Sequence, residues 1–309
     1  MTSTKMKVGL IGTGPWGLTL AKAFQRQGAE IVAHSHARPH RVEGLGVRMP
    51  WQEMPDCAGI DAVIAAGPPG VNLSAAVRCD IKKMPILATK PLMLEAPLFV
   101  MAPVYVDYVH LWSPCYLALK AELGARKAHL GRRITSLACN FSGPGPKREF
   151  SSLRDYGPHA LAFCLDLLGN ELPYERKFLK VKSVHRTPGV LPGCENYSVG
   201  GYVDGVPVGL TVGSGSRDPN RFLIVQLDDG AELIYRETKP SASFSIRKGD
   251  EILNIVKVAH VHDPLGAMVT DFIDNVRVGR ANTYPMNLTV QITKAIMDIE
   301  SVSARIASQ

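Results

Sequence analysis

The sequence predicts an α/β protein in which a doubly wound parallel sheet is followed by an α+β domain with a large, open, mainly antiparallel sheet. The first of three observations is that apolar strand-like runs alternate with helix-compatible segments over the first third of the 309 residues, as in β-α-β units. The second is a succession of strand-like runs from residue 180 to 258, with hairpin signals such as Asp204-Gly205 between them. The third is a glycine pattern near the start of the chain, where a strand-like run meets a helix-compatible segment.

The glycine pattern is G-x-G-x-x-G, formed by Gly12, Gly14 and Gly17 between an apolar run at 8–11 and a helix-compatible segment at 18–25. In this context it is the fingerprint of a Rossmann-type dinucleotide site. The first glycine permits a tight turn, the second lets the backbone approach a pyrophosphate, and the third lets helix and strand pack closely. The helix N-terminus would offer unpaired N–H groups to the phosphates; a chance glycine turn is the alternative. The candidate cofactor contacts in the turn are Gly12, Thr13, Gly14, Pro15, Trp16 and Gly17.

The other elements of the first part follow in order. We expect strands at 30–35, 61–66, 85–89 and 105–111, and helices at 71–79 and 114–129. The run at 61–66 is apolar almost throughout, which is typical of a strand buried on both faces. The turn that ends this run and the start of the next helix add the candidate cofactor contacts Gly67, Pro68, Pro69 and Asn72.

The pattern changes after residue 133, where strands are no longer separated by helices. The expected elements are a strand at 134–141, a loop at 142–152, a helix at 156–168 closed by Gly169, strands at 180–185, 197–203, 206–213, 222–227, 232–237, 243–247 and 252–258, and helices at 264–278 and 287–307. The expected domains are a dinucleotide-binding domain at 1–115, a substrate-binding and oligomerisation domain at 116–285, and a C-terminal helix at 286–309 that packs back on the first domain.

Composition favours a cytoplasmic enzyme with an anionic small-molecule ligand. The net charge of +7 is spread along the chain without a long basic block, so a nucleic-acid partner, which needs a clustered basic face, is disfavoured. Diffuse positive charge suits an anionic cofactor or substrate. The six cysteines lie far apart without a C-x-x-C pair, which is typical of reduced thiols in the cytoplasm. We expect neither a secretory leader nor a membrane partner, because no apolar run reaches spanning length.

The cofactor preference depends on the residues around the end of the expected strand at 30–35. An NAD-preferring site usually has Asp or Glu there to hold the ribose hydroxyls, whereas this stretch contains Ser35, His36, Arg38 and Arg41 and no acid. Because arginine forks bind phosphate bidentately, the stretch favours NADP, with NAD as the alternative; the arginines could equally be solvated loop charges. No carboxylate or cysteine accompanies the nearby histidines, so we expect no metal.

Two further groups of residues indicate chemistry. Lys90 follows the expected strand at 85–89, at the edge of a parallel sheet where ligands bind, so it is a candidate cofactor contact as well as a candidate catalytic residue. A lysine there can hold a carbonyl or alkoxide oxygen or relay a proton, although it could also be a surface lysine. Asp155 and His159 can share one helix face, where the carboxylate would fix the imidazole tautomer for acid–base catalysis. In the alternative, Asp155 caps the helix and His159 has no chemical role.

These motifs together resemble those of a known family. The glucose-fructose oxidoreductase / inositol dehydrogenase / rhizopine-catabolism (Gfo/Idh/MocA) family has the same order of glycine pattern, Gly67-Pro68-Pro69, Thr89-Lys90-Pro91-Leu92 and Asp155-x-Gly157-x-His159. The resemblance covers nearly the whole chain and implies NAD(P)-dependent chemistry on sugars, polyols and their derivatives. It implies that Lys90 contacts the reacting oxygen, that His159 is the acid–base with Asp155 beside it, and that the Lys90–Pro91 peptide is cis.

We therefore expect hydride transfer between nicotinamide C4 and a carbinol or carbonyl carbon, with Lys90 stabilising charge on the oxygen and His159 moving the proton, or with these two roles exchanged. The stretch at 108–112 is apolar and aromatic where the family has an Asn-Arg loop. It keeps open a reductase of a C=N bond or of a non-sugar carbonyl; a non-catalytic NADP-sensing protein is the third hypothesis. The candidate substrate contacts are Tyr108, His110, Trp112, Arg154 and Tyr156. The open sheet predicts a homodimer or a higher even homo-oligomer.

Overall fold

The computed structural model describes residues 5–36, 44–95, 102–144, 150–169, 178–189, 192–238, 241–258, 263–280 and 284–307. The chain forms two compact units. Unit 1 comprises Met1–Val109 and Leu265–Val290, and unit 2 comprises His110–Pro264 and Gln291–Gln309. This division differs from the expected boundaries at 115 and 285, because the chain enters unit 1 a second time. The last helix therefore does not return to unit 1 as a whole: from Gln291 onwards it belongs to unit 2.

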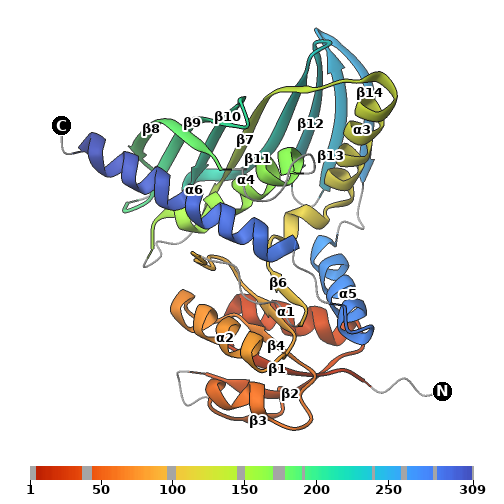
Figure 1. The fold of residues 1–309 in the computed structure, drawn as a ribbon, viewed down its shortest axis with the longest axis vertical. Coiled ribbons are helices and arrows are strands. Elements are labelled where there is room, and N and C mark those ends of the chain that lie inside the picture. Colours follow the sequence, from red (N-terminus) through yellow and green to blue (C-terminus); the bar gives the residue numbers. More distant parts are fainter. Residues whose placement is uncertain are drawn as a thin grey trace. The chain divides into compact units, whose positions relative to one another are not determined.

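Unit 1 contains a six-stranded sheet in which every pair of neighbours is parallel, in the order β3-β2-β1-β4-β5-β6 (Figure 1). The strands are β1 (Lys7–Ile11), β2 (Glu30–Ser35), β3 (Val47–Arg48), β4 (Ala62–Ala65), β5 (Ile86–Ala88) and β6 (Val104–Val106). The helices of unit 1 are α1 (Pro15–Arg26), the 3₁₀ helix η1 (Trp51–Asp56), α2 (Pro69–Ile81) and α5 (Pro264–Arg277). The sequence prediction of a doubly wound parallel sheet is confirmed, while β3 and η1 were not foreseen.

The apolar strands of unit 1 form its core as the pattern predicts. All four residues of β4 are fully buried, as expected for a strand covered on both faces. Helix α5 adds Phe272, whose ring meets Phe24 of α1 edge-on at 5.8 Å and Tyr105 of β6 at 5.2 Å. The hydroxyl of Tyr105 donates to Asp271 of α5. These contacts explain why a segment so late in the sequence belongs to unit 1.

The expected strand at 105–111 is too long. β6 ends at Val106, and a 3₁₀ helix, η2 (Val109–Trp112), follows. The Asp107 N–H still donates to the Ala88 carbonyl at 2.9 Å, but the Tyr108 N–H donates to the Val106 carbonyl at 2.7 Å. The chain therefore turns away from the sheet at Asp107, so this acid lies at the carboxyl edge of the sheet and not inside a strand.

Unit 2 contains an eight-stranded sheet in the order β14-β13-β12-β11-β7-β10-β9-β8. The strands are β7 (Ile134–Pro144), β8 (Lys180–Pro188), β9 (Glu195–Val203), β10 (Val206–Gly213), β11 (Gly215–Leu227), β12 (Ala231–Thr238), β13 (Ser241–Lys248) and β14 (Glu251–Val258). All neighbours are antiparallel except β7 and β10, which pair in parallel. The prediction of a mainly antiparallel open sheet is confirmed, and the Asp204-Gly205 hairpin turn has the predicted positive φ angles of 50° and 81°.

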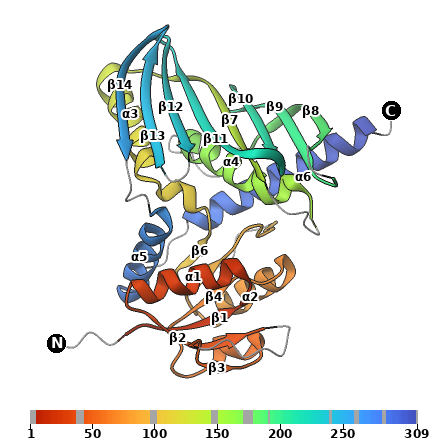
Figure 2. The same cartoon turned by 180° about the vertical axis from the view of Figure 1, so that it is seen from behind.

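Helices cover one face of this sheet, as Figures 1 and 2 show from opposite sides. Helix α4 (Ser152–Gly169) packs on β7, β9 and β10, and α3 (Pro114–Leu130) packs on β12, β13 and β14. The closing helix α6 (Tyr284–Ala307) is tied to α4 by a two-pronged ion pair between Arg154 and Glu300, with N–O distances of 2.7 and 2.8 Å. No helix among the described residues covers the opposite face, where side chains alternate with the buried ones along each strand.

Helix α4 begins four residues before the expected start at 156. β7 continues to Pro144, and the helix starts at Ser152, where the Ser151 carbonyl accepts the Arg154 N–H at 3.0 Å. Asp155 is therefore in the first turn and is not the capping residue, so the capping alternative is wrong. Pro158 lies in the second turn of the helix, and it removes one backbone donor there.

Candidate functional site

The glycine turn of unit 1 has the geometry that a dinucleotide site requires. Gly12 has φ +87°, and a Cβ atom there would lie 2.5 Å from the Ala66 carbonyl oxygen. A Cβ atom on Gly17 would lie 2.0 Å from the Gly12 carbonyl oxygen, so this position is closed to any larger residue. Around Gly14, by contrast, a Cβ atom would meet nothing within 4 Å. The turn is thus tight on its inner side and open at the one position where a phosphate approaches the backbone.

Two further observations fit an anion at this turn. Gly14 is the N-cap of α1 and no side chain caps the helix, so its first N–H groups are available to a phosphate. The hydroxyl oxygen of Thr13 is buried and has no hydrogen-bond partner among the described residues. A buried hydroxyl without a partner is costly, and a phosphate oxygen would satisfy it. The residues present therefore fit the pyrophosphate of a dinucleotide.

The end of β2 lies beside this turn. The Gly12 N–H donates to the Ser35 carbonyl at 2.9 Å, and Arg48 of β3 donates to the His36 carbonyl at 3.3 Å. Neither Ser35 nor His36 is an acid, so the part of this edge that the structure describes lacks the carboxylate that holds a ribose diol. Arg38 and Arg41, the predicted phosphate ligands, lie outside the described residues.

Asn72 holds two loops of unit 1 together. Its side-chain oxygen accepts the Gly67 N–H at 2.8 Å, and its amide nitrogen donates to the Thr89 hydroxyl at 2.8 Å. The side chain is only 1% exposed. The proline pair before it begins α2. Asn72, predicted as a cofactor contact, therefore positions the turn after β4 against the residue that precedes Lys90.

Lys90 follows β5 at the carboxyl edge of the sheet, and its peptide bond to Pro91 is cis, as expected. The same edge carries Asp107, at the end of β6, which is 1% exposed. Oδ2 of Asp107 accepts the indole N–H of Trp16 at 2.6 Å. Burial raises the pKa of Asp107 to about 6, although the Trp16 hydrogen bond and the Lys90 charge oppose the rise. An acid, a lysine and an indole thus meet at the edge where the cofactor is expected.

Helix α4 of unit 2 carries Asp155 and His159 one turn apart on the same face. Both side chains are largely buried, at 6% and 9% exposure. The His159 ring stacks on Phe141 of β7 with ring centres 5.1 Å apart, and it meets the edge of His110 at 4.9 Å. His159 is therefore held by packing on two sides, which is the rigidity that an acid–base group needs.

His110 is in turn bound by a buried glutamate that the sequence prediction missed. Nδ1 of His110 lies 2.8 Å from Oε2 of Glu237 on β12, and Arg221 of β11 lies 2.5 Å from the other oxygen. Burial alone would raise the pKa of Glu237, but the His110 contact and the Arg221 ion pair lower it to about 2. Glu237 is therefore ionised at any physiological pH, and it holds the His110 ring against His159.

The other predicted substrate contacts have different surroundings. Tyr108 is 3% exposed, and its hydroxyl lies 3.1 Å from that of Thr289 within unit 1. Both prongs of the Arg154 guanidinium are engaged by Glu300. Trp112 lies on η2 and is partly exposed. Tyr156 lies beside Gly143, where a Cβ atom would be 3.7 Å from its hydroxyl. The structure thus places Lys90 and Tyr108 in unit 1, and His110, Arg154, Asp155, Tyr156 and His159 in unit 2.

Two missed residues had signals in the sequence. Asp107 is a single acid in the apolar run at 104–109, and an acid at the end of a parallel strand lies at the ligand edge. Glu237 continues the alternation of Leu233 and Tyr235, which places it on the buried face of β12. A charge on the core face of a strand indicates a buried partner, although its identity does not follow from local pattern.

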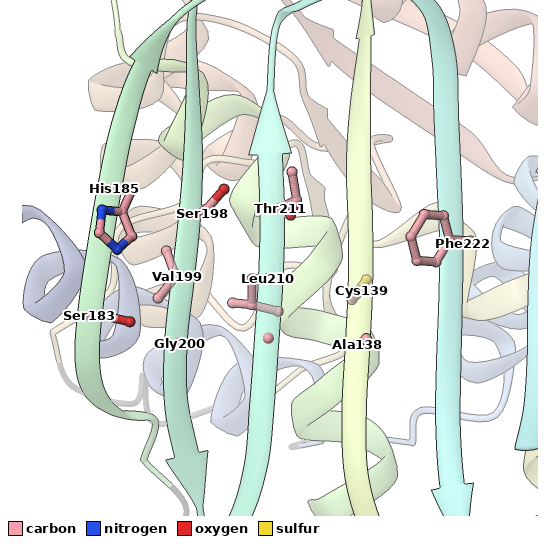
Figure 3. Close-up of a pocket in the computed structure, with 11 residues that line it drawn as sticks. Ala138, Cys139, Ser183, His185, Ser198, Val199, Gly200, Leu210, Thr211 and Phe222 are labelled. Carbon is pink, nitrogen blue, oxygen red and sulfur yellow. The ribbon is translucent and has the colours of Figure 1, made fainter.

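A shallow hollow of about 320 Å³ lies on the face of the unit 2 sheet that the described helices leave uncovered (Figure 3). Ser183, Ser198, Thr211 and Phe222 project from β8, β9, β10 and β11 around it. The hollow is on the opposite face from α4, so it is separate from Asp155 and His159. Apart from His185, its lining has no titratable side chain except the Cys139 thiol, and small side chains and glycines predominate, which suits packing against another protein surface more than chemistry.

Among the described residues, no group of three or more His, Cys, Asp or Glu side chains is arranged as a metal site. No helix in the described part of the chain has the length and apolar content needed to cross a bilayer.

The fold is shared with solved oxidoreductases. A dehydrogenase from Chromobacterium violaceum matches with a TM-score of 0.79 and 12% identity, over 98% of this chain and 96% of that one. KijD10, a 3-ketoreductase from Actinomadura kijaniata solved with TDP-benzene and NADP, matches with a TM-score of 0.77 and 17% identity, over 96% of each chain.

A third solved structure also shares the fold. The UDP-N-acetylglucosamine 3-dehydrogenase GnnA from Acidithiobacillus ferrooxidans matches with a TM-score of 0.74 and 16% identity, over 96% of this chain and 97% of that one. No profile of a known protein family and no curated protein matches the sequence. The chain thus has the two-part fold of this class of oxidoreductases along nearly its whole length.

Proposed function

We propose that the protein is an NADP-dependent oxidoreductase that transfers a hydride between nicotinamide C4 and a carbinol or carbonyl carbon of a sugar, polyol or sugar-derived substrate. The observation that carries the proposal is the glycine turn, in which Gly14 adjoins open space beside the uncapped start of α1. The match to the Gfo/Idh/MocA motifs supports the same proposal, and membership of that family is part of it.

In this proposal, the cofactor's pyrophosphate is held by the turn at 12–17 and the Thr13 hydroxyl. The preference for NADP rests on the absence of an acid at Ser35 and His36 and on the arginines that follow them in the sequence. It is supported by the fold shared with KijD10, which was solved with NADP. When bound, the nicotinamide supplies the carbon that accepts or donates the hydride.

The protein's own groups handle the oxygen and its proton. In the oxidative direction His159 takes the hydroxyl proton, and the Lys90 ammonium stabilises the charge that develops on the oxygen. Asp155 orients His159 from the preceding turn of α4. Phe141 and His110 fix the plane of the His159 ring, and Glu237 keeps His110 in place. In the reductive direction the same groups act in reverse order, with His159 giving the proton.

The substrate class rests on two observations of different kinds. One structural neighbour is named a UDP-N-acetylglucosamine 3-dehydrogenase and another a 3-ketoreductase solved with TDP-benzene, which supports a sugar-derived substrate here. A second candidate, a reductase of a C=N bond or of a non-sugar carbonyl, is favoured by the stretch at 108–112. There the polar groups of Tyr108 and His110 already contact Thr289 and Glu237, so the loop presents fewer hydrogen-bonding groups to a hydroxyl-rich ligand.

A substrate panel tests the proposal. Purified protein is mixed with NADPH and, separately, with aldoses, ketoses, sugar lactones, nucleotide-linked keto sugars and imines, and loss of absorbance at 340 nm is followed. We expect turnover within the sugar-derived group. Turnover of imines alone would replace the first candidate by the second. Tight NADPH binding without turnover of any class would favour a non-catalytic cofactor sensor, and no binding would overturn the proposal.

A double-mutant cycle tests the roles of Lys90 and His159. Lys90→Ala and His159→Ala should each lower kcat/KM by about a thousandfold, and the double variant should lose little more, because groups that serve one transition state are not additive. Lys82→Ala and His129→Ala are matched surface controls with exposed side chains. A double variant that remained active would contradict the proposed mechanism. Fully additive losses of kcat/KM would mean that the two residues act in separate steps.

We also propose that the uncovered face of the unit 2 sheet associates with a second copy. The shallow hollow there is lined by small side chains and glycines, among them Gly200 and Gly209, which permit close approach of another surface. Light scattering at micromolar concentration should give an even multiple of 33.5 kDa. Gly209→Arg should reduce this mass to that of one chain, and a cooperative thermal transition should show that the variant is still folded. A monomeric wild-type protein would contradict the proposal.

A further inference from the structure

Asp107 is the acid in unit 1 whose surroundings the proposed function leaves unexplained. It follows β6 at the carboxyl edge of the sheet, and its backbone N–H still bonds to Ala88 of β5. Its side chain is 1% exposed. Oδ2 accepts the Trp16 indole, while Oδ1 is buried without a hydrogen-bond partner among the described residues. A carboxyl group this buried and only partly satisfied is costly to keep ionised.

The Trp16–Asp107 hydrogen bond connects two distant parts of the sheet edge. Trp16 belongs to the glycine turn after β1, and Asp107 follows β6, while β4 and β5 lie between these strands in the sheet. The indole therefore reaches across the carboxyl edge of two strands. Trp16 remains 41% exposed, so part of its ring is open to a ligand that binds at this edge.

The charges that face Asp107 come from neighbouring segments of unit 1. The Lys90 ammonium approaches from the segment after β5, and the Val109 backbone N–H faces it from η2. The Tyr108 phenol is the other titratable group in this environment, and burial raises its pKa, with the Asp107 charge as a smaller cause. Lys90 is thus the cation that faces Asp107 among these groups.

We propose that Asp107 is a positioning residue, whose carboxylate holds the Trp16 indole over the cofactor edge and sets the placement of the Lys90 ammonium. The proposal rests on the proposed function in one respect, that Lys90 binds the reacting oxygen. A carboxylate accepts the indole N–H and attracts the ammonium at the same time. Once protonated, it keeps an oxygen that can accept the indole N–H but loses the charge that attracts Lys90, so the ionisation of one buried acid governs the placement of the lysine beside the glycine turn.

This coupling explains why an acid is kept where burial opposes its charge. An apolar residue after β6 would cost less to bury, but it would leave the indole N–H without this acceptor and would remove the charge that attracts the Lys90 ammonium. Burial raises the pKa of Asp107 to about 6, so the carboxylate form predominates near neutral pH and is lost in mildly acidic solution. The arrangement should therefore switch off below about pH 6.

The test uses the full chain and the variant Asp107→Asn, whose amide oxygen can still accept the indole N–H but carries no charge. Asp61→Asn is the matched control, because Asp61 is exposed and also accepts one N–H, from Lys7. The first measurement is the rate at which trace acetic anhydride labels Lys90 at pH 8, read by mass spectrometry with Lys82 as the internal reference. We expect Asp107→Asn to raise the Lys90 rate about threefold relative to Lys82, and Asp61→Asn to leave it unchanged.

The second measurement is the pH dependence of Trp16 emission, assigned by difference from Trp16→Phe. We expect a transition with a midpoint of about 6 in the wild type and none in Asp107→Asn. Unchanged Lys90 labelling in a folded Asp107→Asn protein, or the same emission transition in that variant, would overturn the proposal.

Both of these readouts are made without substrate, so they decide the role of Asp107 even if the substrate panel fails. Where a substrate is found, Asp107→Asn should lower kcat about tenfold at pH 8 while the thermal midpoint does not fall. A fall in kcat that merely followed a fall in stability would contradict a positioning role.

Discussion

Two buried carboxyl groups, one in each unit, differ in the direction of their pKa shifts. Asp107 in unit 1 has a pKa raised by burial to about 6, whereas Glu237 in unit 2 has a pKa lowered to about 2 despite its burial. Asp107 has one short hydrogen bond, from a neutral indole, and one cation near it. Glu237 has Arg221 at 2.5 Å on one oxygen and His110 at 2.8 Å on the other. At Glu237 the Arg221 ion pair and the His110 contact outweigh the effect of burial and lower the pKa, whereas the interactions of Asp107 do not.

The difference fits the two proposed tasks. Glu237 is a permanent anion that holds His110 against His159, so its work is structural and constant with pH. Asp107, with a pKa raised to about 6, gains its proton in mildly acidic solution, so it can act as a switch. The signs of the stability contributions are opposite as well. At neutral pH the lowered pKa of Glu237 favours the folded state, whereas the raised pKa of Asp107 opposes it.

The largest expected effect is the loss of the Glu237 anion. Glu237→Gln should lower the free energy of unfolding by about 3 kcal/mol at pH 7.5, because Arg221, whose side chain is only 16% exposed, is left without its counter-ion. Urea unfolding measures the change. The control is Glu232→Gln on the same strand, whose partner Arg247 is 45% exposed, so less than about 1 kcal/mol should be lost. Equal losses of unfolding free energy in Glu237→Gln and Glu232→Gln would contradict the special role given to the Glu237 charge.

The pH dependence of this loss has a defined sign. The folded-state pKa of Glu237 is depressed from 4.5 to about 2, so its contribution is complete above pH 4.5 and disappears as the pH falls toward 2. The gap between wild type and Glu237→Gln should therefore be constant from pH 8 to 5 and narrow below that. A gap that widened on acidification would contradict the assignment.

The opposite and smaller change is expected for Asp107. Its folded-state pKa is raised from 3.8 to about 6, so the folded state loses stability as the pH rises through this window. Asp107→Asn should be more stable than wild type by about 1–2 kcal/mol at pH 8 and equal to it near pH 4. Thermal unfolding across this range tests the prediction, and a variant less stable at pH 8 would show that the charge is stabilising.

The smallest expected effect is that of His110→Asn, which tests how much the His110 contact contributes to the lowered pKa of Glu237. His110→Asn replaces the imidazole beside Glu237 by a neutral amide, while Arg221 and the Tyr235 hydroxyl still donate to the carboxylate, and should cost about 1 kcal/mol. The acid transition linked to Glu237 should move to higher pH, toward that of an ordinary glutamate. If it stays in place, Arg221 alone accounts for the lowered pKa of Glu237.

Local pattern was sufficient for much of the fold. The apolar run before Ala66 and the Asp204-Gly205 hairpin are set by short-range chemistry, and the structure confirms both. The strand predicted at 105–111 was too long because the apolar content of this stretch matches a strand. In the structure the Tyr108 N–H donates to the Val106 carbonyl, and this hydrogen bond turns the chain away from the sheet. The parallel pairing of β7 with β10 also lies beyond local pattern, since the two strands are joined through other elements.

In the candidate site, too, some features follow from local sequence and others depend on the fold. The roles of Gly12, Gly14 and Gly17 follow from a motif whose context lies within a few residues, and the geometry at each position agrees with it. The contact between His110 and Glu237 joins residues 127 positions apart, so it depends on how strands are ordered in a sheet. Sequence could mark Glu237 as a charge on a core face, but only the fold supplies its partners.

The central claim, that the glycine turn of unit 1 binds NADP, is tested most directly by titrating wild type and Gly14→Val with NADPH. A Cβ atom at Gly14 meets nothing within 4 Å, so the variant should keep the wild-type thermal midpoint while its side chain occupies the space of the pyrophosphate. We expect wild type to bind NADPH at micromolar concentration and the variant at least about tenfold more weakly. Equal NADPH affinity in the two proteins, or no binding by the wild type, would contradict the account.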